Sequence, residues 1–345
     1  MGLSDGFSRL PANVQAVAES LMLPKGTEEW VMETAMKKGC VACGIRCNAD
    51  RNSGRGFCGI DDKIYAARFG LHFGEEPFFT GEGGSGTVFF AGCSLRCRFC
   101  QNAQISRFTP QAGAHSISTE ELADIFRKLA DMGAENINLV SPTPYAELIG
   151  EAIAVVKADG FGLPFVYNSH GNDSPETVAR LAGLIDVWLP DVKYGSNSLG
   201  RKYSGADNLW DNARKTVRLM YEISGRLRLN ARGLAYAGVA VRHLILPDEI
   251  ESSLSVIDFL ETVDRGVYLS LMSQYRPPEW GDDLYPNLGR KLREDEYLRV
   301  TEYAKTLGFD NIMLQDMSSS DSFVPDFNKA NIFGDENEKK IVSDW

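Results

Sequence analysis

The chain has 345 residues, of which 43% are hydrophobic and 24% are charged, and its formal net charge is -11 at pH 7. This composition is typical of a folded globular protein, and the negative charge repels nucleic-acid phosphates, so we expect no nucleic-acid partner. No apolar run reaches about 18 residues and the chain does not begin like a signal peptide. We therefore expect a cytoplasmic protein that has no membrane partner.

The N-terminal quarter of the chain shows little regular periodicity. Residues 11–37 predict two short helices, the second beginning at Thr27 and ending before Gly39. Residues 40–86 are rich in Gly, Asn, Asp and Arg, so we expect an irregular segment that needs something other than its own core to hold it together. We treat residues 1–86 as N-terminal helices followed by a Cys-rich, metal-binding segment.

From Thr87 the pattern changes to alternating strands and helices. Strands are predicted over 87–92, 136–141, 164–169, 186–192, 239–246, 267–273 and 311–315. Helices are predicted over 117–133, 144–160, 208–223, 249–263 and 294–307, and from 174 onward. Six strand-helix units with apolar strands predict an α/β fold, an incomplete (β/α)6 barrel.

Two helix starts carry chemical signals. Ser118 and Glu121 have the spacing of a capping box, and Ser174 is followed by Pro175 at the first helical position. The last predicted strand leads into a polar C-terminal tail over residues 318–345, which leaves residues 87–317 for the barrel.

The seven cysteines of the chain fall into two tight groups. Cys40, Cys43, Cys47 and Cys58 form the first, and Cys93, Cys97 and Cys100 form the second. Clustering in a cytoplasmic protein indicates metal ligation, because disulfides are disfavoured there and seven is an odd number. The alternative, small hydrophobic core residues, predicts cysteines that are scattered singly.

The second group has the spacing Cys-x3-Cys-x2-Cys directly after an apolar strand. Three thiolates can hold three irons of a [4Fe-4S] cubane and leave the fourth iron without a protein ligand. Such a vacancy favours chemistry at the iron over simple electron transfer. The alternative is a tetrahedral zinc site that takes one ligand from elsewhere.

The stretch GCSLRCRFCQN, with Phe99 directly before the last cysteine, resembles the motif of the radical S-adenosylmethionine superfamily. The resemblance implies a radical SAM partial barrel over residues 87–317. It also implies that S-adenosylmethionine binds the open iron and that Phe99 is one of the cofactor-binding residues. One-electron reduction then releases a 5′-deoxyadenosyl radical that abstracts a substrate hydrogen, and the protein positions the reacting groups.

Further pieces of the sequence resemble pyruvate formate-lyase activating enzymes, in particular a longer subgroup of their homologues. These pieces are INLVSPTP, LPDVKY, RHLILP, SLMSQYRP and LQDMSSSDSFVPDFN. By this resemblance Asp191, Lys193 and Arg242 hold the methionine or ribose part of the cofactor, and Lys193 and Arg242 suit a carboxylate. The alternative for each is a solvated charge near a strand end.

The loop after the second strand departs from the activating enzymes. Where they carry Gly-Gly-Glu-Pro, this chain has Ser141, Pro142, Thr143 and Pro144, so the Ser141 or Thr143 hydroxyl would have to receive the cofactor. Asn168 ends the third strand and is expected at the cofactor as well. His170 follows it, and its role is either structural or else catalytic or substrate-binding.

The first cysteine group, Cys40, Cys43, Cys47 and Cys58, supplies four thiolates with the spacing Cys-x2-Cys-x3-Cys-x10-Cys. An auxiliary iron-sulfur cluster and a structural zinc both accept four cysteines, and the spacing alone leaves both open. A complete ligand set favours a structural or electron-relay role.

Together these patterns predict a radical SAM oxidoreductase with a [4Fe-4S] cluster and S-adenosylmethionine. The resemblance implies hydrogen abstraction from a glycine of a partner glycyl-radical enzyme, with electrons from a flavodoxin- or ferredoxin-type donor. Two alternatives stay open: radical modification of another peptide or small molecule, and a non-catalytic iron-sulfur or zinc binding protein.

Overall fold

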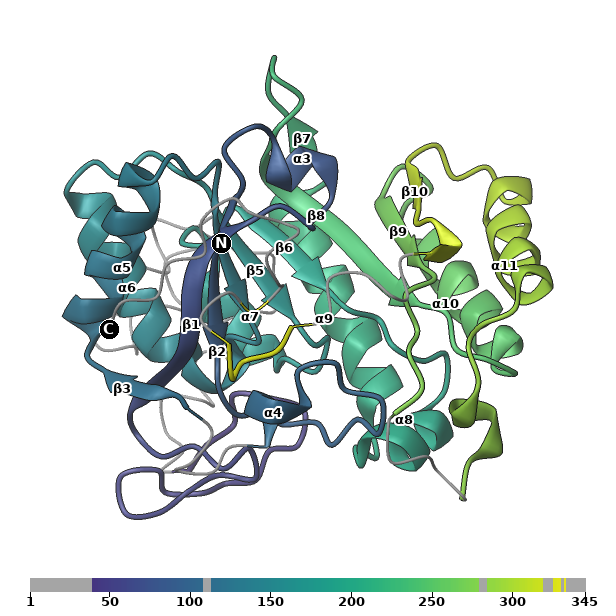
Figure 1. Cartoon of the computed structure of the whole chain (residues 1–345), viewed down its shortest axis with the longest axis horizontal. Coiled ribbons are helices and arrows are strands. Elements are labelled where there is room, and N and C mark those ends of the chain that lie inside the picture. Colours follow the sequence, from purple (N-terminus) through teal and green to yellow (C-terminus); the bar gives the residue numbers. More distant parts are fainter. Residues whose placement is uncertain (1–38, 108–112, 279–283, 319–324, 330–331, 333–345) are drawn as a thin grey trace, which may run out of the picture.

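A computed structural model of the chain describes residues 39–107, 113–278, 284–318, 325–329 and 332. The two helices predicted over residues 11–37 lie outside these residues. Within the described part, ten strands form one sheet in the order β10-β9-β8-β6-β5-β4-β2-β1-β3, and β7 pairs with β8 off this path (Figure 1). None of the described helices is both long enough and apolar enough to cross a membrane.

The strands are β1 Ile64–His72, β2 Ser85–Phe90, β3 His115–Ile117, β4 Ile137–Val140, β5 Phe165–Ser169, β6 Val187–Pro190, β7 Arg228–Leu229, β8 Ala235–Leu244, β9 Tyr268–Met272 and β10 Ile312–Leu314. The helices are α3 Pro77–Thr80, α4 Ala103–Ser106, α5 Thr119–Asp131, α6 Ala146–Ala158, α7 Pro175–Leu181, α8 Asn197–Ser204, α9 Leu209–Ser224, α10 Ile250–Val263 and α11 Glu294–Thr306. Two 3-10 turns, η2 Thr143–Tyr145 and η3 Pro286–Gly289, complete the described elements.

The predicted α/β partial barrel is confirmed. Strands β2, β4, β5, β6, β8, β9 and β10 follow one another across the sheet and pair with each other in parallel. Each of the first six is followed by at least one helix that returns the chain to the start of the next strand, as parallel pairing requires. Strand β10 is the short last strand that the sequence predicted.

Both predicted helix starts are confirmed. At the start of α5 the Ser118 hydroxyl accepts the Glu121 backbone N–H at 3.1 Å, and Glu121 Oε2 accepts the Ser118 N–H at 2.7 Å. At the start of α7 the Ser174 hydroxyl accepts the Thr177 N–H at 3.1 Å. These caps satisfy backbone donors that have no partner inside the helix.

The prediction that residues 40–86 form an irregular segment is wrong for the second half of that range. Ile64–His72 is a nine-residue strand, β1, which pairs antiparallel with both β2 and β3. Its alternation is hidden because residues on both faces are buried and because Arg68 and Gly70 interrupt the apolar run. The short helices α3, α4 and α8 and the short strands β3 and β7 were also not predicted.

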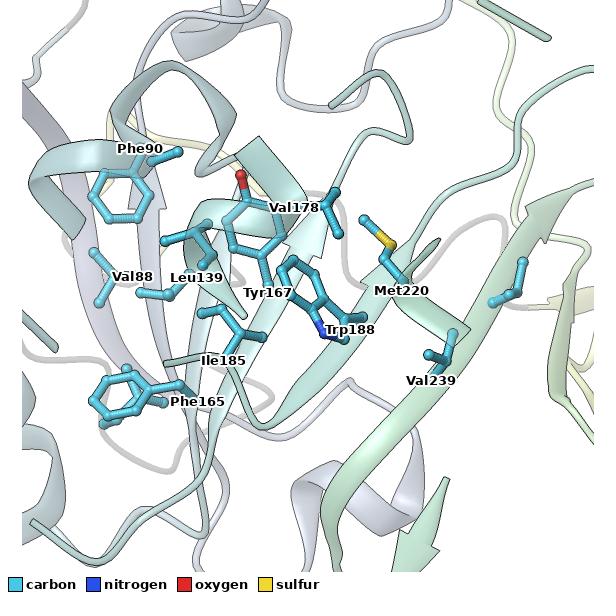
Figure 2. Close-up of a cluster of buried hydrophobic side chains, with 14 of the residues drawn as sticks. Val88, Phe90, Leu139, Phe165, Tyr167, Val178, Ile185, Trp188, Met220 and Val239 are labelled. Carbon is cyan, nitrogen blue, oxygen red and sulfur yellow. The ribbon is translucent and has the colours of Figure 1, made fainter. Parts of the chain in front are cut away.

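The main core lies between the sheet and the helices. Outward-facing strand residues such as Val88, Leu139, Tyr167 and Trp188 pack against the helices, as Figure 2 shows for the central strands. Trp188 is fully buried, and its ring Nε1 donates to Ser224 at the end of α9 at 3.0 Å. The helices are therefore held against one face of the sheet, and the other face is left for the barrel interior.

The amino end of the barrel interior is filled with side chains. Phe78 and Phe79 of α3 pack there with Val166, Val187 and Leu189 from the strands. Figure 1 places α3 at the end of the sheet opposite α4, which follows the second cysteine group. The interior can therefore be hollow only toward the carboxyl ends of the strands, where barrel enzymes carry their active sites.

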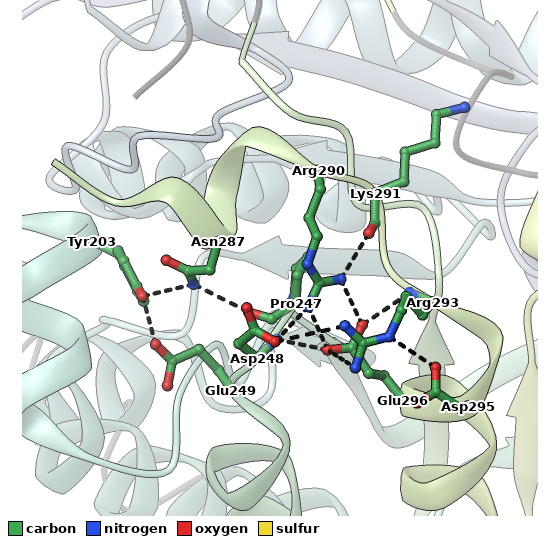
Figure 3. A network of polar contacts seen from close by, with 10 residues as sticks. All are labelled: Tyr203, Pro247, Asp248, Glu249, Asn287, Arg290, Lys291, Arg293, Asp295 and Glu296. Carbon is green, nitrogen blue, oxygen red and sulfur yellow. Dashed lines mark hydrogen bonds and ion pairs between the residues drawn. The ribbon is translucent and has the colours of Figure 1, made fainter. Parts of the chain in front are cut away.

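A polar network ties the loop after β8 to the start of α11 (Figure 3). Arg290 donates to Glu296 Oε1 at 2.7 Å, and the Asp248 backbone N–H donates to the same oxygen at 2.9 Å. Hydrogen bonding from Arg290 lowers the pKa of Glu296 to about 2. The network fixes the last strand-helix unit at the edge of the barrel.

Candidate active site

The second cysteine group lies on the loop that follows β2. Gly92 has a φ of 75°, and a Cβ there would stand 2.6 Å from the side chain of Ile60, so this turn favours glycine. The loop is anchored to α8, because the Arg96 N–H donates to Ser204 O at 2.8 Å and the Arg98 N–H to Tyr203 O at 2.9 Å. Backbone bonds to a distant helix thus hold the three cysteines at the carboxyl end of the strands.

A cavity of about 550 Å³ opens at this end of the barrel. Its lining includes most of the residues that the sequence predicted for the site: Cys93, Cys97, Phe99, Cys100, Ser141, Asn168, His170, Asp191, Lys193 and Arg242. The volume is within the range of small-molecule and cofactor pockets, roughly 300–1,000 Å³. Thr143 is not among the lining residues.

The three thiols lie together on the cavity wall, with Cys93 buried and Cys97 and Cys100 partly buried. Burial raises the pKa of Cys93, and the neighbouring Cys97 and Cys100 raise it further. Burial also raises the pKa of Cys97, while Lys193 and the Ser204 hydroxyl act in the opposite direction. Closely placed buried thiolates need a strongly positive partner, and the irons of a cluster supply one.

Serine hydroxyl groups also lie within hydrogen-bond distance of two of the sulfurs. Ser204 Oγ lies 2.9 Å from Cys97 Sγ and 2.7 Å from the Tyr194 hydroxyl, and Ser106 Oγ lies 3.4 Å from Cys100 Sγ. Among the described residues, no group of three Cys, His, Asp or Glu side chains is arranged to hold one metal ion. In a cubane each thiolate binds a different iron, and the donor set of three thiols around one cavity fits that group.

Lys193 and Asp191 form a partly buried ion pair on the cavity wall. Lys193 Nζ lies 2.6 Å from Asp191 Oδ2. Burial opposes the charged ammonium, but Asp191 and Cys97 outweigh burial and raise the pKa of Lys193 above its ordinary value. Lys193 therefore stays cationic beside the thiols and can receive a carboxylate.

Arg242 reaches the same cavity from β8, but its guanidinium is already held by two carboxylates. Its Nε donates to Glu76 Oε1 at 2.8 Å, and its Nη2 donates to both Glu75 and Glu76. Burial raises the pKa of Glu75, yet Arg242 outweighs burial and leaves that pKa below the usual range. A cofactor carboxylate at Arg242 would have to share it with these two groups.

Asn168 and Ser141 meet at the ends of β5 and β4, where the Ser141 backbone N–H donates to Asn168 O at 3.0 Å. Ser141 has a φ of 59°, a conformation that non-glycine residues rarely adopt. The predicted loop thus turns sharply beside the cavity, and Ser141 and Asn168 both line it.

His170 lies between the two cysteine groups. Its Nδ1 accepts the Asn172 N–H at 3.1 Å, and its Nε2 lies 3.0 Å from Ser94 Oγ. Burial lowers the pKa of His170, so the imidazole is neutral at pH 7. These two bonds give His170 a defined structural position on the cavity wall.

The four cysteines of the first group line a second, small cavity together with Arg51, Ser94 and Thr143. Burial raises the pKa of Cys43 to about 11 and also raises the pKa of Cys58. The structure thus brings together the four thiols that the sequence grouped. Thr143, predicted at the cofactor, instead donates to Asp173 Oδ1 at 2.7 Å on this side.

Among the cavity residues that were not predicted from the sequence are His72, Glu75 and Glu76. His72 ends β1, a strand that the sequence did not reveal, and the two glutamates follow it, so all three reach the cavity from outside the parallel strands. Their only signal is the pair of glutamates before Pro77, which by itself reads as a solvated turn.

Comparison with known protein families agrees with the family resemblance that the cysteine loop indicated. The radical SAM superfamily profile matches residues 87–227, which include Cys93, Cys97 and Cys100. An uncharacterised protein of Methanocaldococcus jannaschii, MJ0674, is 30% identical over 282 residues, which are 80% of this chain and 77% of that protein.

Several solved structures are similar at low identity. Streptococcus suis SuiB bound to its precursor peptide SuiA is 15% identical with a TM-score of 0.45, over 65% of this chain and 46% of SuiB. Methylornithine synthase PylB is 18% identical with a TM-score of 0.44, over 64% of this chain and 60% of PylB. A domain of a pyruvate-formate lyase-activating enzyme from Bacteroides vulgatus is 13% identical with a TM-score of 0.33, over 57% of this chain and 91% of that domain.

The chain thus spans about half the length of SuiB and less than two thirds of PylB. The family match covers the loop that carries Cys93, Cys97 and Cys100 at the barrel mouth. This chain belongs to the radical SAM superfamily, whose enzymes use a [4Fe-4S] cluster and S-adenosylmethionine.

Proposed function

We propose that this chain is a hydrogen-abstracting radical enzyme whose [4Fe-4S] cluster is held by Cys93, Cys97 and Cys100. The observation that carries the proposal is that the three thiols line one cavity together with the cationic Lys193. The cluster and S-adenosylmethionine would supply a 5′-deoxyadenosyl radical that takes a hydrogen atom from the substrate.

The residues of this chain bind and orient the cofactor. Lys193 offers an ammonium group for the carboxylate of the methionine part, with Asp191 holding it in place at 2.6 Å. Ser141 and Asn168 offer polar groups at the neighbouring strand ends. Phe99 packs with Tyr275 at a ring-centroid distance of 5.7 Å and forms an apolar wall of the site.

A glycine Cα of a partner glycyl-radical enzyme is the substrate that we propose first. The cavity has about the volume of one small ligand, so a protein substrate can enter it only with a narrow segment. Glycine has no side chain, and it therefore brings its Cα hydrogens closest to a deep site. A flavodoxin- or ferredoxin-type protein would supply the electron.

A second candidate, radical modification of another peptide or a small molecule, is favoured by the loop after β4. This loop has Ser141 and Pro142 where activating enzymes have two glycines, and Thr143 faces Asp173 instead of the cavity. Glu75 and Glu76 place two carboxylates against the single cation of Arg242 on the cavity wall, and this excess of acidic groups suits a substrate that carries a cation.

The test is anaerobic cluster reconstitution followed by S-adenosylmethionine and reductant. The wild-type chain should form 5′-deoxyadenosine and the Cys97→Ala variant should not, and absence of the product with a reduced wild-type cluster would leave only a non-catalytic binding protein. Addition of a cognate glycyl-radical enzyme should then give a glycyl radical doublet in electron paramagnetic resonance spectra. Product without any such doublet would favour the second candidate.

A further inference from the structure

Ser204 places its hydroxyl beside one sulfur of the active-site loop. Its Oγ lies 2.9 Å from Cys97 Sγ, and Ser204 is fully buried. The backbone of the same residue is fixed as well, because Ser204 O accepts the Arg96 N–H at 2.8 Å. Ser204 is the last residue of α8. This helix end therefore holds the cysteine loop with its carbonyl and contacts a sulfur with its side chain.

A second hydroxyl lies behind Ser204. Tyr194 is on the loop after β6 and is 2% exposed, and its Oη lies 2.7 Å from Ser204 Oγ. The ring of Tyr194 packs against Phe99 at a centroid distance of 6.5 Å and against Tyr203 at 6.1 Å. Neighbouring aromatic rings thus fix the position from which the Tyr194 hydroxyl reaches Ser204.

The direction of both hydrogen bonds follows from the chemistry of a cluster ligand. A cysteine that binds iron is a thiolate, so Cys97 Sγ then carries no proton and can only accept. Ser204 has one hydroxyl proton, which it donates to the sulfur, and its oxygen accepts the Tyr194 O–H. In such a chain each hydrogen bond polarises the next, and burial strengthens both.

The other two sulfurs of the loop have longer contacts. Cys93 Sγ accepts the Leu95 backbone N–H at 3.4 Å, and Cys100 Sγ lies 3.4 Å from Ser106 Oγ. Of these three contacts the one at Cys97 is the shortest. It comes from a side chain, so a substitution can remove the donor and leave the backbone bonds of the loop in place.

We propose that Ser204 and Tyr194 are positioning residues that set the reduction potential of the active-site cluster. Ser204 donates to the Cys97 ligand, and Tyr194 holds that hydroxyl in place. The inference rests on the proposed function, because it needs the [4Fe-4S] cluster at Cys93, Cys97 and Cys100. On reduction the cluster gains one electron from the donor protein, and a hydrogen bond to a ligand sulfur stabilises the additional negative charge. The bond therefore raises the potential and favours reduction.

Anaerobic redox titration of the full-length reconstituted chain tests this inference. The midpoint potential is followed by the electron paramagnetic resonance signal that the Cys97→Ala variant lacks. Ser204→Ala should shift this potential to a lower value. Tyr194→Phe should shift it in the same direction by less, because Ser204 keeps its own proton. Iron content is measured on every variant to show that the cluster is bound.

A double variant tests whether Tyr194 acts through Ser204. In the Ser204→Ala background, Tyr194→Phe should cause no further shift, because the group between Tyr194 and the sulfur is already gone. Tyr203→Phe is the matched control. It removes a hydroxyl from the same group of buried side chains, but that hydroxyl donates to Glu249. The potential of Tyr203→Phe should equal that of the wild type.

The outcomes separate this inference from the proposed function. An unchanged potential in Ser204→Ala at full iron content would overturn the inference and leave the proposed function intact. Equal shifts in Tyr194→Phe and Tyr203→Phe would remove Tyr194 from it. Should Ser204→Ala lose its iron, an unchanged potential in Tyr194→Phe would overturn the inference instead. A wild-type chain that binds no iron at the three cysteines would overturn the proposed function too, and the titration does not require cleavage of S-adenosylmethionine.

Discussion

Lys193 Nζ lies 2.6 Å from Asp191 Oδ2 on the wall of the cavity that the three active-site thiols line. This pair has a counterpart elsewhere, because Lys157 Nζ lies 3.2 Å from Asp186 Oδ1 on the helical side of the barrel. The two lysines have the same chemistry, and only Lys193 lines the cavity. Substituting each lysine in turn therefore distinguishes an effect on cofactor binding from an effect on the stability of the fold.

Lys193→Met should weaken binding of S-adenosylmethionine. A hydrogen bond to a charged group contributes about 1.5–3 kcal/mol, so the dissociation constant should rise roughly 10- to 150-fold. Anaerobic titration calorimetry on the reconstituted chain measures it, with iron content checked in parallel. Lys157→Met should bind as the wild type does, and equal affinity in both variants would remove Lys193 from the site.

His243 should make stability depend on pH. Val192 O lies 2.6 Å from His243 Nδ1 and can only accept, and Nε2 lies 2.8 Å from Ser253 Oγ, so the neutral ring is satisfied. Burial lowers its pKa from 6.5 to about 4. The unfolded chain therefore takes up a proton at a higher pH than the folded chain does.

The sign follows from this difference. The contribution of His243 is complete above about pH 6.5 and is lost as the pH falls toward about 4, by up to roughly 3 kcal/mol. In urea unfolding at pH 7.5 and pH 5, His243→Gln should lose less stability on acidification than the wild type.

Asn138 should be replaceable by an apolar residue. It is fully buried on β4, and neither its Nδ2 nor its Oδ1 has a hydrogen-bond partner among the described residues. An unsatisfied buried polar group costs about 1–3 kcal/mol, so Asn138→Leu should raise the free energy of unfolding.

Asn136 is the matched control for this substitution. It accepts from Ser85 Oγ and donates to Phe79 O, both at 2.7 Å, so Asn136→Leu should lower stability. Urea unfolding of the two variants measures the difference. A loss in Asn138→Leu similar to that in Asn136→Leu would show that a bound group satisfies Asn138 in solution.

Removal of metal should loosen the first cysteine segment before the barrel. Between residues 39 and 63 the buried side chains are Cys43, Cys58 and Ile60, too few for a core. Arg51 is held by Asp61 O at 2.7 Å and by Pro144 O. After anaerobic chelation, trypsin should cut faster at Arg51 and Arg55, while sites within 113–278 should stay protected.

Limited proteolysis with mass spectrometry follows this change, and iron and zinc content are measured on the same samples. Cleavage at Arg51 that stays slow after metal loss would mean that the segment is held by its protein contacts alone. Those contacts include the Arg46–Glu176 ion pair at 2.6 Å, which joins the segment to α7.

The barrel could be predicted because its strands are buried on both faces and read as apolar runs. Val187–Pro190 is such a run, and capped helices such as α5 separate one run from the next. Strand β1 could not be predicted in this way, because Arg68 and Gly70 break its pattern and its place depends on pairing with distant β2.

The site was predictable to the extent that its chemistry lies in one short stretch. Three cysteines within eight residues stay close together in any fold, so the sequence alone defines them as one ligand set. The hydrogen bonds from Arg242 to Glu75 and Glu76 join residues more than 160 positions apart, and no local sequence pattern predicts them. The turn of Thr143 toward Asp173 likewise depends on tertiary packing.

Among the strands that the structure describes, β10 and β3 are the two ends of the sheet and do not pair with each other, so these strands do not close the barrel by hydrogen bonding all the way around. The cavity is nevertheless lined from β2, by Phe89, across to β10, by Met313 and Leu314. Because the edge strands need not stay at a fixed separation, the gap between them can widen without breaking a ladder bond. An unclosed barrel of this kind can admit substrates of different bulk on one unchanged set of catalytic groups.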